Sequence, residues 1–243
     1  MQFMEKPKLA LIRPSRHSEA QVVDNISLLA LTSEADVTFL NPLDRRHNWT
    51  DLDFITGRFN GAILLGATMD YTRPTQARRL YREAIAPHVT KSIRENFPLM
   101  GICMGHQAIA DIQGGLVERD EQRTELGTTQ LHLVGNERKK ALYDDVGQPI
   151  EMSFTHRNSV VDLPKDAEVV GYTKRDPHSV IRYADSVVTY NGHPEETDVT
   201  ELELYAWILK EEPYRLEQTY PITEPSHEGQ IIVNFIRSLN TLG

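Results

Sequence analysis

Cysteine is almost absent from this chain: Cys103 is the only one among 243 residues. A single cysteine excludes an intrachain disulfide and a cysteine-rich metal site, so we expect no bound metal. One unpaired thiol also fits a reducing compartment, and residues 1–7 are too short and too polar a segment for a secretory signal. The sequence therefore predicts a cytoplasmic protein.

Long apolar runs and large basic clusters are also missing. No apolar run approaches the length of about 18 residues that a membrane span needs, so we expect no membrane partner. The formal net charge of −9 argues against a nucleic-acid partner, and the basic groups at 45–46 and 138–140 are short. The sequence also lacks the Gly-x-x-x-x-Gly-Lys-Ser/Thr and Ser-Gly-Gly-x-Asp phosphate loops, so it has neither of these means of activating an acceptor with ATP.

Strand and helix patterns alternate in the first half of the chain. Apolar runs predict strands at 8–12, 37–40, 61–65 and 98–102, and helical patterns occupy 18–33 and 74–96. Strands joined by helices of this length form parallel sheets with right-handed crossovers. We therefore expect an α/β fold with a mostly parallel central sheet, whose ligands bind at the carboxyl ends of the strands.

The second half reads differently. Short strand-like segments at 129–134, 150–154, 168–173, 179–183 and 186–190 predict a smaller antiparallel extension, and helices are expected at 197–210 and 228–239. No linker, repeat or low-complexity tract interrupts the chain. The simplest organisation is one domain over residues 1–243.

Cys103 lies where a predicted strand meets a predicted helix. Glycines stand two residues before it and two after it, at Gly101 and Gly105, as a sharp strand-to-helix corner requires. The first N–H groups of the helix and its positive dipole end point at the sulfur and favour the thiolate. A buried structural cysteine beside an ordinary turn is the alternative interpretation.

A cysteine nucleophile needs a histidine base and a group that orients it. His193-Pro194-Glu195 follows a predicted strand, and residues two apart in extended chain point the same way, so Glu195 can reach one imidazole nitrogen. On its own, this tripeptide is more typical of a plain turn after a strand, and only together with the corner at Cys103 does it favour a catalytic pair. His106 is expected to support the corner, and His17, His47, His88 and His227 are expected at the surface.

These motifs resemble those of the class I, triad-type glutamine amidotransferases, most nearly the glutaminase component of GMP synthesis. The resemblance rests on Gly-Ile-Cys-Met-Gly-His-Gln at 101–107 and on the His-Pro-Glu at 193–195. Weaker matches lie at 114–115, 125–127 and 154–160, where the last looks like a loop facing the substrate. The similarity spans roughly residues 8–198 and implies a flavodoxin-like fold without a cofactor.

The resemblance implies a role for each matched residue. Cys103 is expected to attack the side-chain amide of glutamine, with His193 as acid and base and Glu195 orienting it. Backbone N–H groups of Gly66, Ala67 and Met104 are expected to form the oxyanion hole. The residues expected to bind the substrate are Gln107, Arg157, Asn158 and Ser159.

Two departures from the family pattern leave the substrate open. Alanine stands at 67 where the family usually has a second glycine. Its N–H can still donate to the oxyanion, unless the loop needs a positive φ at that position. Tyr-Asn-Gly at 190–192 replaces the common glutamine plus aromatic.

The first hypothesis is a stand-alone glutaminase that passes ammonia to a separate ATP-dependent synthase. The alternatives are a γ-glutamyl hydrolase or peptidase with the same triad, and an inactive regulatory subunit.

Overall fold

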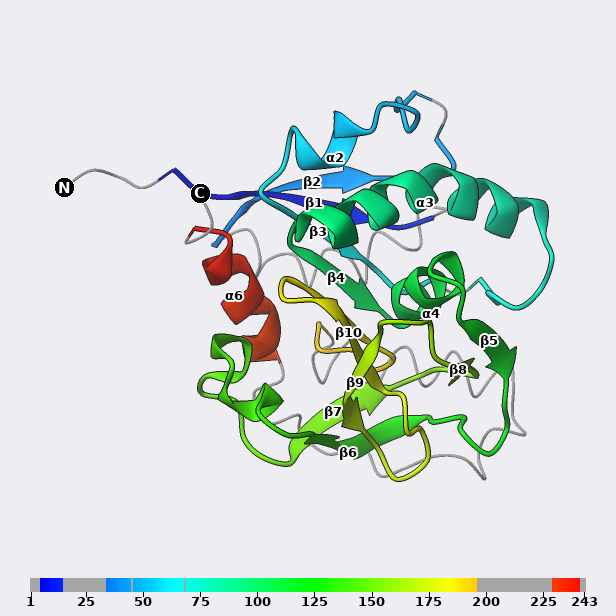
Figure 1. Ribbon diagram of the computed structural model, residues 1–243, viewed down its shortest axis with the longest axis vertical. Coiled ribbons are helices and arrows are strands. Elements are labelled where there is room, and N and C mark those ends of the chain that lie inside the picture. The colour runs from blue at the N-terminus through cyan, green and yellow to red at the C-terminus, as the bar shows by residue number, and fades with distance from the viewer. Residues whose placement is uncertain (1–4, 15–33, 45, 68, 196–228, 241–243) are drawn as a thin grey trace.

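A nine-stranded sheet forms the centre of the molecule in the computed structural model, which describes residues 5–14, 34–44, 46–67, 69–195 and 229–240 (Figure 1). Its strand order is β2-β1-β3-β4-β11-β10-β9-β6-β7. These strands are β1 Lys8–Ile12, β2 Asp36–Leu40, β3 Gly61–Leu64, β4 Leu99–Ile102, β6 Gly127–Leu133, β7 Ile150–Phe154, β9 Glu168–Tyr172, β10 Val180–Ala184 and β11 Val187–Tyr190.

The first five strands in this order run parallel, and the other four are antiparallel to their neighbours. The predicted mostly parallel core with an antiparallel extension is therefore confirmed. The extension joins the core edge to edge, because β11 pairs with β4 on one side and with β10 on the other. A separate two-stranded sheet consists of β5 Leu116–Arg119 and β8 Asn158–Asp162.

Helices cover both faces of the sheet (Figure 1). They are α2 Asp53–Thr56, α3 Gln76–Glu95, α4 Met104–Ile112 and α6 Gly229–Ser238, with short 3₁₀ turns η1 Glu137–Lys139 and η2 Ala141–Tyr143. Alternate residues of a strand face opposite sides, and the core divides accordingly. Leu9 and Leu11 of β1 join the cluster that contains the apolar face of α6, whereas Ala10 and Ile12 join the cluster of α2, α3 and α4.

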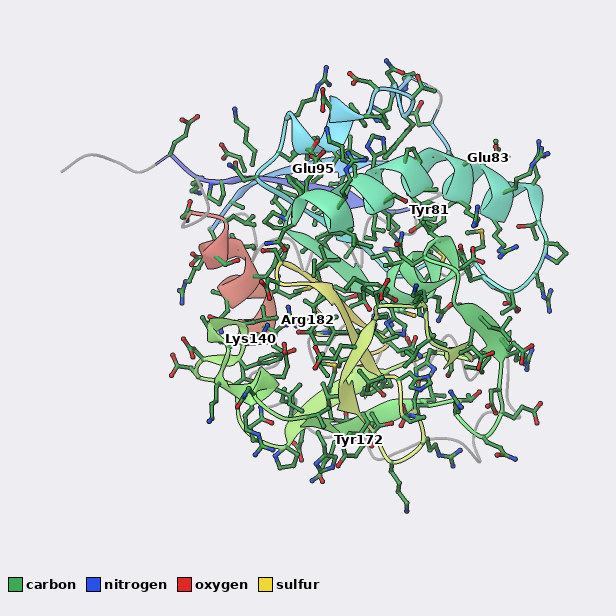
Figure 2. The ribbon with its side chains drawn as sticks, viewed as in Figure 1. Tyr81, Glu83, Glu95, Lys140, Tyr172 and Arg182 are labelled. Carbon is green, nitrogen blue, oxygen red and sulfur yellow. The ribbon has the colours of Figure 1, made fainter. Side chains whose placement is uncertain are left out.

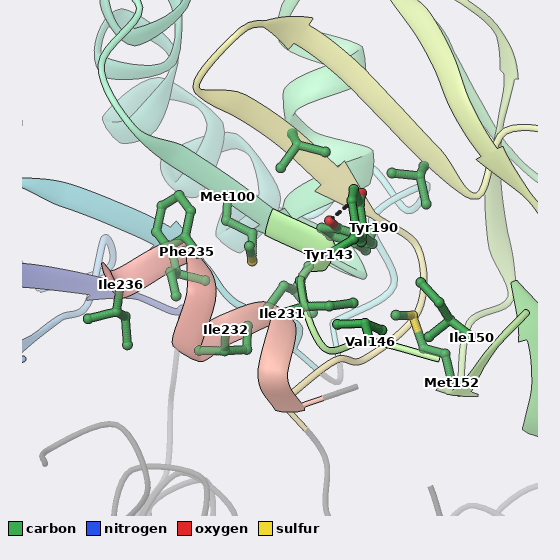
Figure 3. Packing of buried hydrophobic residues seen from close by; sticks show 14 of the residues in the cluster. Met100, Tyr143, Val146, Ile150, Met152, Tyr190, Ile231, Ile232, Phe235 and Ile236 are labelled. Atoms are coloured by element: carbon green, nitrogen blue, oxygen red, sulfur yellow. Dashed lines mark hydrogen bonds between the residues drawn. The ribbon is translucent and has the colours of Figure 1, made fainter. Parts of the chain in front are cut away.

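A buried polar group interrupts the apolar cluster beneath α6. The hydroxyl groups of Tyr143 and Tyr190 lie 2.7 Å apart within that cluster and form a hydrogen bond. Figure 3 draws this bond as a dashed line. Nearby, Arg182 forms an ion pair with Glu137, and Lys140 Nζ lies 3.9 Å from Oε2 of the same carboxylate. Arg182 and Lys140 are labelled in Figure 2. Because buried polar groups are costly unless they are paired, these contacts fix η1 and η2 against β10 and β11.

The predicted elements are largely confirmed where the structure describes them. The expected helices at 18–33 and 197–210 lie outside the described residues. Strands β5 and β8 and helix α2 were not predicted. Of the stretch 154–160 that was expected to be a loop, β7 takes residue 154 and β8 takes residues 158–160, which leaves residues 155–157 outside a strand. Among the described helices, none is both long and apolar enough to cross a membrane.

Candidate active site

Cys103 occupies the corner between β4 and α4, as the sequence predicts. Its backbone has φ 49° and ψ −107°, a conformation that residues with a side chain rarely adopt. The corner is held from both sides, since the Cys103 N–H donates to the Tyr190 carbonyl and the Cys103 carbonyl accepts from the Gln107 N–H. Strain of this kind persists only where surrounding contacts fix it, and it is common at functional sites.

The two glycines beside Cys103 are required by close packing. A Cβ on Gly105 would lie 2.1 Å from the carbonyl oxygen of Leu64, so α4 can approach the end of β3 only without a side chain there. A Cβ on Gly101 would lie 2.8 Å from Ile109 and 2.9 Å from Thr189. The glycine spacing read from the sequence thus reflects contacts with β3 and β11 as well as the turn itself.

His193 reaches the site from the end of β11. Its N–H donates to the carbonyl of Ser153 at 2.9 Å, in an isolated antiparallel bridge with the end of β7. Gly192 allows this approach, because a Cβ there would lie 2.6 Å from the Met152 sulfur and 2.9 Å from the Phe154 ring. The imidazole is therefore placed by two neighbouring backbone segments.

The side chains of Cys103 and His193 meet at Gly66, and Glu195 contacts the same histidine. A Cβ on Gly66 would lie 3.0 Å from His193 Cε1 and 3.8 Å from Cys103 Sγ, so the imidazole and the thiol border the same point. The Nδ1 of His193 lies 2.9 Å from Glu195 Oε1, as the sequence predicts. On the other side of the ring, Nε2 lies 2.8 Å from the hydroxyl of Thr155, a residue that the sequence analysis did not select.

The loop after β3 accommodates alanine at position 67. Neither Gly66 nor Ala67 is among the residues with positive φ. Ala67 therefore sits in an ordinary backbone conformation, and the missing second glycine causes no strain. Met104 is the first residue of α4 and is buried directly after the nucleophile candidate.

A buried amide network links α4 to β8 and β11. The Gln107 amide nitrogen lies 3.2 Å from both the Asn158 carbonyl and Asn191 Oδ1, and the Asn191 amide donates in turn to Asp176 Oδ2 at 2.9 Å. Gln107 is 3% exposed, so it is not a helix-surface residue. Asn158 and Ser159 are buried, and Arg157 is half-buried beside them.

Asp70 is a further residue of this region that sequence reasoning missed. Its Oδ1 accepts from the Asn158 amide at 3.1 Å and from the N–H and hydroxyl of Thr72. Burial works to raise the pKa of Asp70, but the hydrogen bonds from Thr72 and Asn158 outweigh it and lower that pKa. The loop after β3 is thereby tied to the start of β8.

His106 and His88 are both buried. His106 supports the corner as predicted, with Nδ1 2.8 Å from the Thr189 hydroxyl. The expectation that His88 is exposed is wrong: it is 4% exposed, contacts Trp49 and lies 3.1 Å from the Trp49 carbonyl. Burial lowers its pKa.

The burial of His106 predicts a loss of stability in acid. Burial lowers its pKa from 6.5 to about 3, so the folded chain cannot bind the proton that the unfolded chain binds below about pH 6.5. The contribution of the uncharged His106 ring to the stability of the fold is therefore complete above about pH 6.5, and it is lost as the pH falls toward 3. We expect the free energy of unfolding to fall by about 2 kcal/mol from this residue between about pH 7.5 and pH 5. Urea titrations of the wild type and of His106→Gln at both pH values measure this change. The free energy of unfolding should fall by about 2 kcal/mol less in the variant than in the wild type. An equal fall in both proteins would contradict the prediction.

A family model, "Glutamine amidotransferase class-I", matches residues 46–205, which include Gly66, Cys103, His193 and Glu195. This chain is a class-I glutamine amidotransferase family member. The resemblance noted from the motifs is thereby confirmed.

Curated relatives of this amidotransferase carry several different names. The chain is 28% identical to gamma-glutamyl peptidase 2 of Arabidopsis thaliana over 46% of this chain and 45% of that protein. It is 28% identical to anthranilate synthase component 2 of Helicobacter pylori, over 42% and 50% of the respective chains. It is 30% identical to the glutamine-hydrolyzing GMP synthase of Aquifex aeolicus, over 46% of this chain and 22% of that protein. The matches thus span half or less of these relatives.

Solved structures confirm the amidotransferase fold over nearly the whole chain. A glutamine amidotransferase from Thermotoga maritima superposes with a TM-score of 0.70 at 16% identity, covering 97% of this chain and 99% of that one. A glutamine amido transferase from Methylobacillus flagellatus gives a TM-score of 0.60 at 14% identity, covering 98% and 91%. At such low identities the likeness concerns the fold alone.

Proposed function

We propose that this amidotransferase hydrolyses the side-chain amide of glutamine to glutamate and ammonia through a thioester on Cys103. The observation that carries the proposal is the set of contacts that links three groups through His193. The strained Cys103 and the His193 ring border Gly66, and the same ring is held by Glu195. Such an arrangement suits a nucleophile, a base and its orienting acid.

In the first proposed half-reaction, the Cys103 thiol gives its proton to His193 and Sγ attacks the amide carbon of the substrate. The carbon–nitrogen bond breaks as His193 returns that proton to the leaving nitrogen, and ammonia departs. In the second half-reaction His193 takes a proton from water, whose oxygen attacks the thioester carbon and releases glutamate and the thiol. Glu195 holds Nδ1 and stabilises the charged ring.

The remaining site residues have supporting roles in this proposal. Backbone N–H groups of Met104, Gly66 and Ala67 bind the oxyanion of the tetrahedral intermediates. The substrate-binding residues are Gln107, Arg157, Asn158 and Ser159. Gln107 and Asn158 belong to the buried network that joins α4 to β8. This network supports a rigid substrate-binding surface between these two elements.

We further propose that a separate ATP-dependent synthase, in the cytoplasm, receives the ammonia. The names of two relatives, a glutamine-hydrolyzing GMP synthase and a component of anthranilate synthase, support coupling to a synthase. A second candidate is hydrolysis of γ-glutamyl peptides, favoured by the similarity to gamma-glutamyl peptidase 2. It uses the same residues and differs only in the leaving amine. An inactive regulatory subunit is the third hypothesis.

A comparison of substrates separates these functions. We expect the purified chain to release glutamate from glutamine faster than from a γ-glutamyl dipeptide of equal concentration. Glutamate is measured by an enzyme-coupled assay, with the Cys103→Ala variant as the blank. Activity on the dipeptide alone supports the second candidate. Inertness toward both substrates contradicts both enzymatic candidates and favours the regulatory one.

A further inference from the structure

Thr155 contacts Nε2 of His193, the imidazole nitrogen that would take the proton from a cysteine nucleophile. The residue is half-buried and follows directly after β7, and its Oγ1 lies 2.8 Å from His193 Nε2. The contact depends on the backbone bridge between Ser153 and His193, which places the end of β7 beside the histidine. Two ring nitrogens of His193 are therefore bound in this structure, one by Glu195 and one by Thr155.

The protonation of the ring follows from these partners. A carboxylate only accepts hydrogen bonds, so Nδ1 carries the hydrogen that it donates to Glu195. In the neutral ring Nε2 is then an acceptor, and the Thr155 hydroxyl donates to it. An imidazole nitrogen has one in-plane bonding direction. While this direction is taken by Thr155, it is not available to the thiol of Cys103.

The orientation of the ring agrees with this competition. The His193 atom that lies against Gly66, on the side of Cys103, is Cε1, with Nε2 turned to Thr155. Threonine reaches Nε2 from a different strand end than the one that carries the cysteine.

We propose that Thr155 is a positioning residue that competes with the Cys103 thiol for His193 Nε2 and so holds a resting state in which the thiol keeps its proton. This inference rests on the roles proposed above for Cys103 and His193. When a bound substrate or partner turns the hydroxyl away, the S–H bond breaks, the proton moves to Nε2, and Sγ keeps the electron pair as the attacking thiolate.

The rate of alkylation by iodoacetamide across pH tests this competition, because only the thiolate reacts and Cys103 is the only cysteine. We expect Thr155→Val to be alkylated about three- to tenfold faster near neutral pH, the factor by which one hydrogen bond shifts an equilibrium. The midpoint of its pH profile should move to lower pH. Thr155→Ser keeps the hydroxyl and should restore the wild-type profile. Thr129→Val, which removes a hydroxyl from the neighbouring strand β6, should also match the wild type.

An unchanged or slower alkylation in Thr155→Val overturns the proposal, since a hydroxyl that helped the base would slow the reaction on removal. Thermal melting checks that each variant is folded, and Thr155→Ala replaces the valine variant if that one does not fold. The reagent is not a substrate, so the proposed function is judged separately. If alkylation responds as expected but neither glutamine nor a γ-glutamyl dipeptide is turned over, the proposed function is contradicted and the proposed competition is supported. If glutamine is hydrolysed but the wild type and Thr155→Val have the same pH profile of alkylation, only the proposed competition is contradicted.

Discussion

We expect the replacement of Cys103 by alanine to lower the proposed release of glutamate from glutamine by at least about a thousandfold, because a thioester needs a thiol at this site. Cys103 is the only thiol of the chain, so no neighbouring cysteine can substitute for it. The rate is measured at saturating glutamine, and we expect the loss to fall on kcat.

The corner itself should survive this change, and melting curves provide the control. Alanine keeps the Cβ and the backbone hydrogen bonds of residue 103 to Tyr190 and Gln107. A folded Cys103→Ala chain that retains more than about a tenth of the wild-type kcat would contradict the proposed nucleophile, because the residual rate would exceed what binding and the oxyanion hole supply.

Replacing Gly105 by alanine should lower the free energy of unfolding by about 3 kcal/mol, the upper end of the usual range for overpacked sites. The new Cβ would lie 2.1 Å from the Leu64 carbonyl oxygen, and a backbone atom cannot rotate away. Alanine gains about 1 kcal/mol over glycine in helix propensity, which is too little to offset the clash. Urea unfolding measures the change, and the movement of α4 should also reduce activity.

Gly147→Ala is the matched control for this variant. Gly147 has an ordinary φ, and nothing lies within 4 Å of a Cβ built on it. Its substitution should change the free energy of unfolding by no more than about 0.5 kcal/mol. If Gly105→Ala were as stable as Gly147→Ala, the close contact between α4 and the end of β3 would be wrong.

The sequence predicted the features that local pattern encodes. The corner at Cys103 and the pairing of His193 with Glu195 each depend on residues within a few positions of one another, and glycine spacing and extended-chain geometry are enough to predict them. The buried strands of the parallel core were predicted for the same reason, since continuous apolar runs mark strands covered on both faces.

Contacts between distant segments could not be read in this way. Strand β5 is short and largely exposed, and only its pairing with β8 makes it a strand. His88 was predicted at the surface, but Trp49, which is distant in the sequence, covers it in the fold. The contact of Thr155 with His193 depends on the bridge between Ser153 and His193, which no local sequence pattern predicts. The position of Thr155 beside His193 is therefore known only from the structure.

Covalent labelling by a glutamine analogue tests the central claim most directly. The chain is incubated with 6-diazo-5-oxo-L-norleucine, a reagent that binds as glutamine and alkylates the attacking group, and is then analysed by mass spectrometry with peptide mapping. We predict one adduct per chain, on Cys103, that is suppressed by excess glutamine and slowed in His193→Asn. An unlabelled Cys103 in the folded protein, or labelling that glutamine does not suppress, would contradict a glutamine-binding nucleophile at this corner.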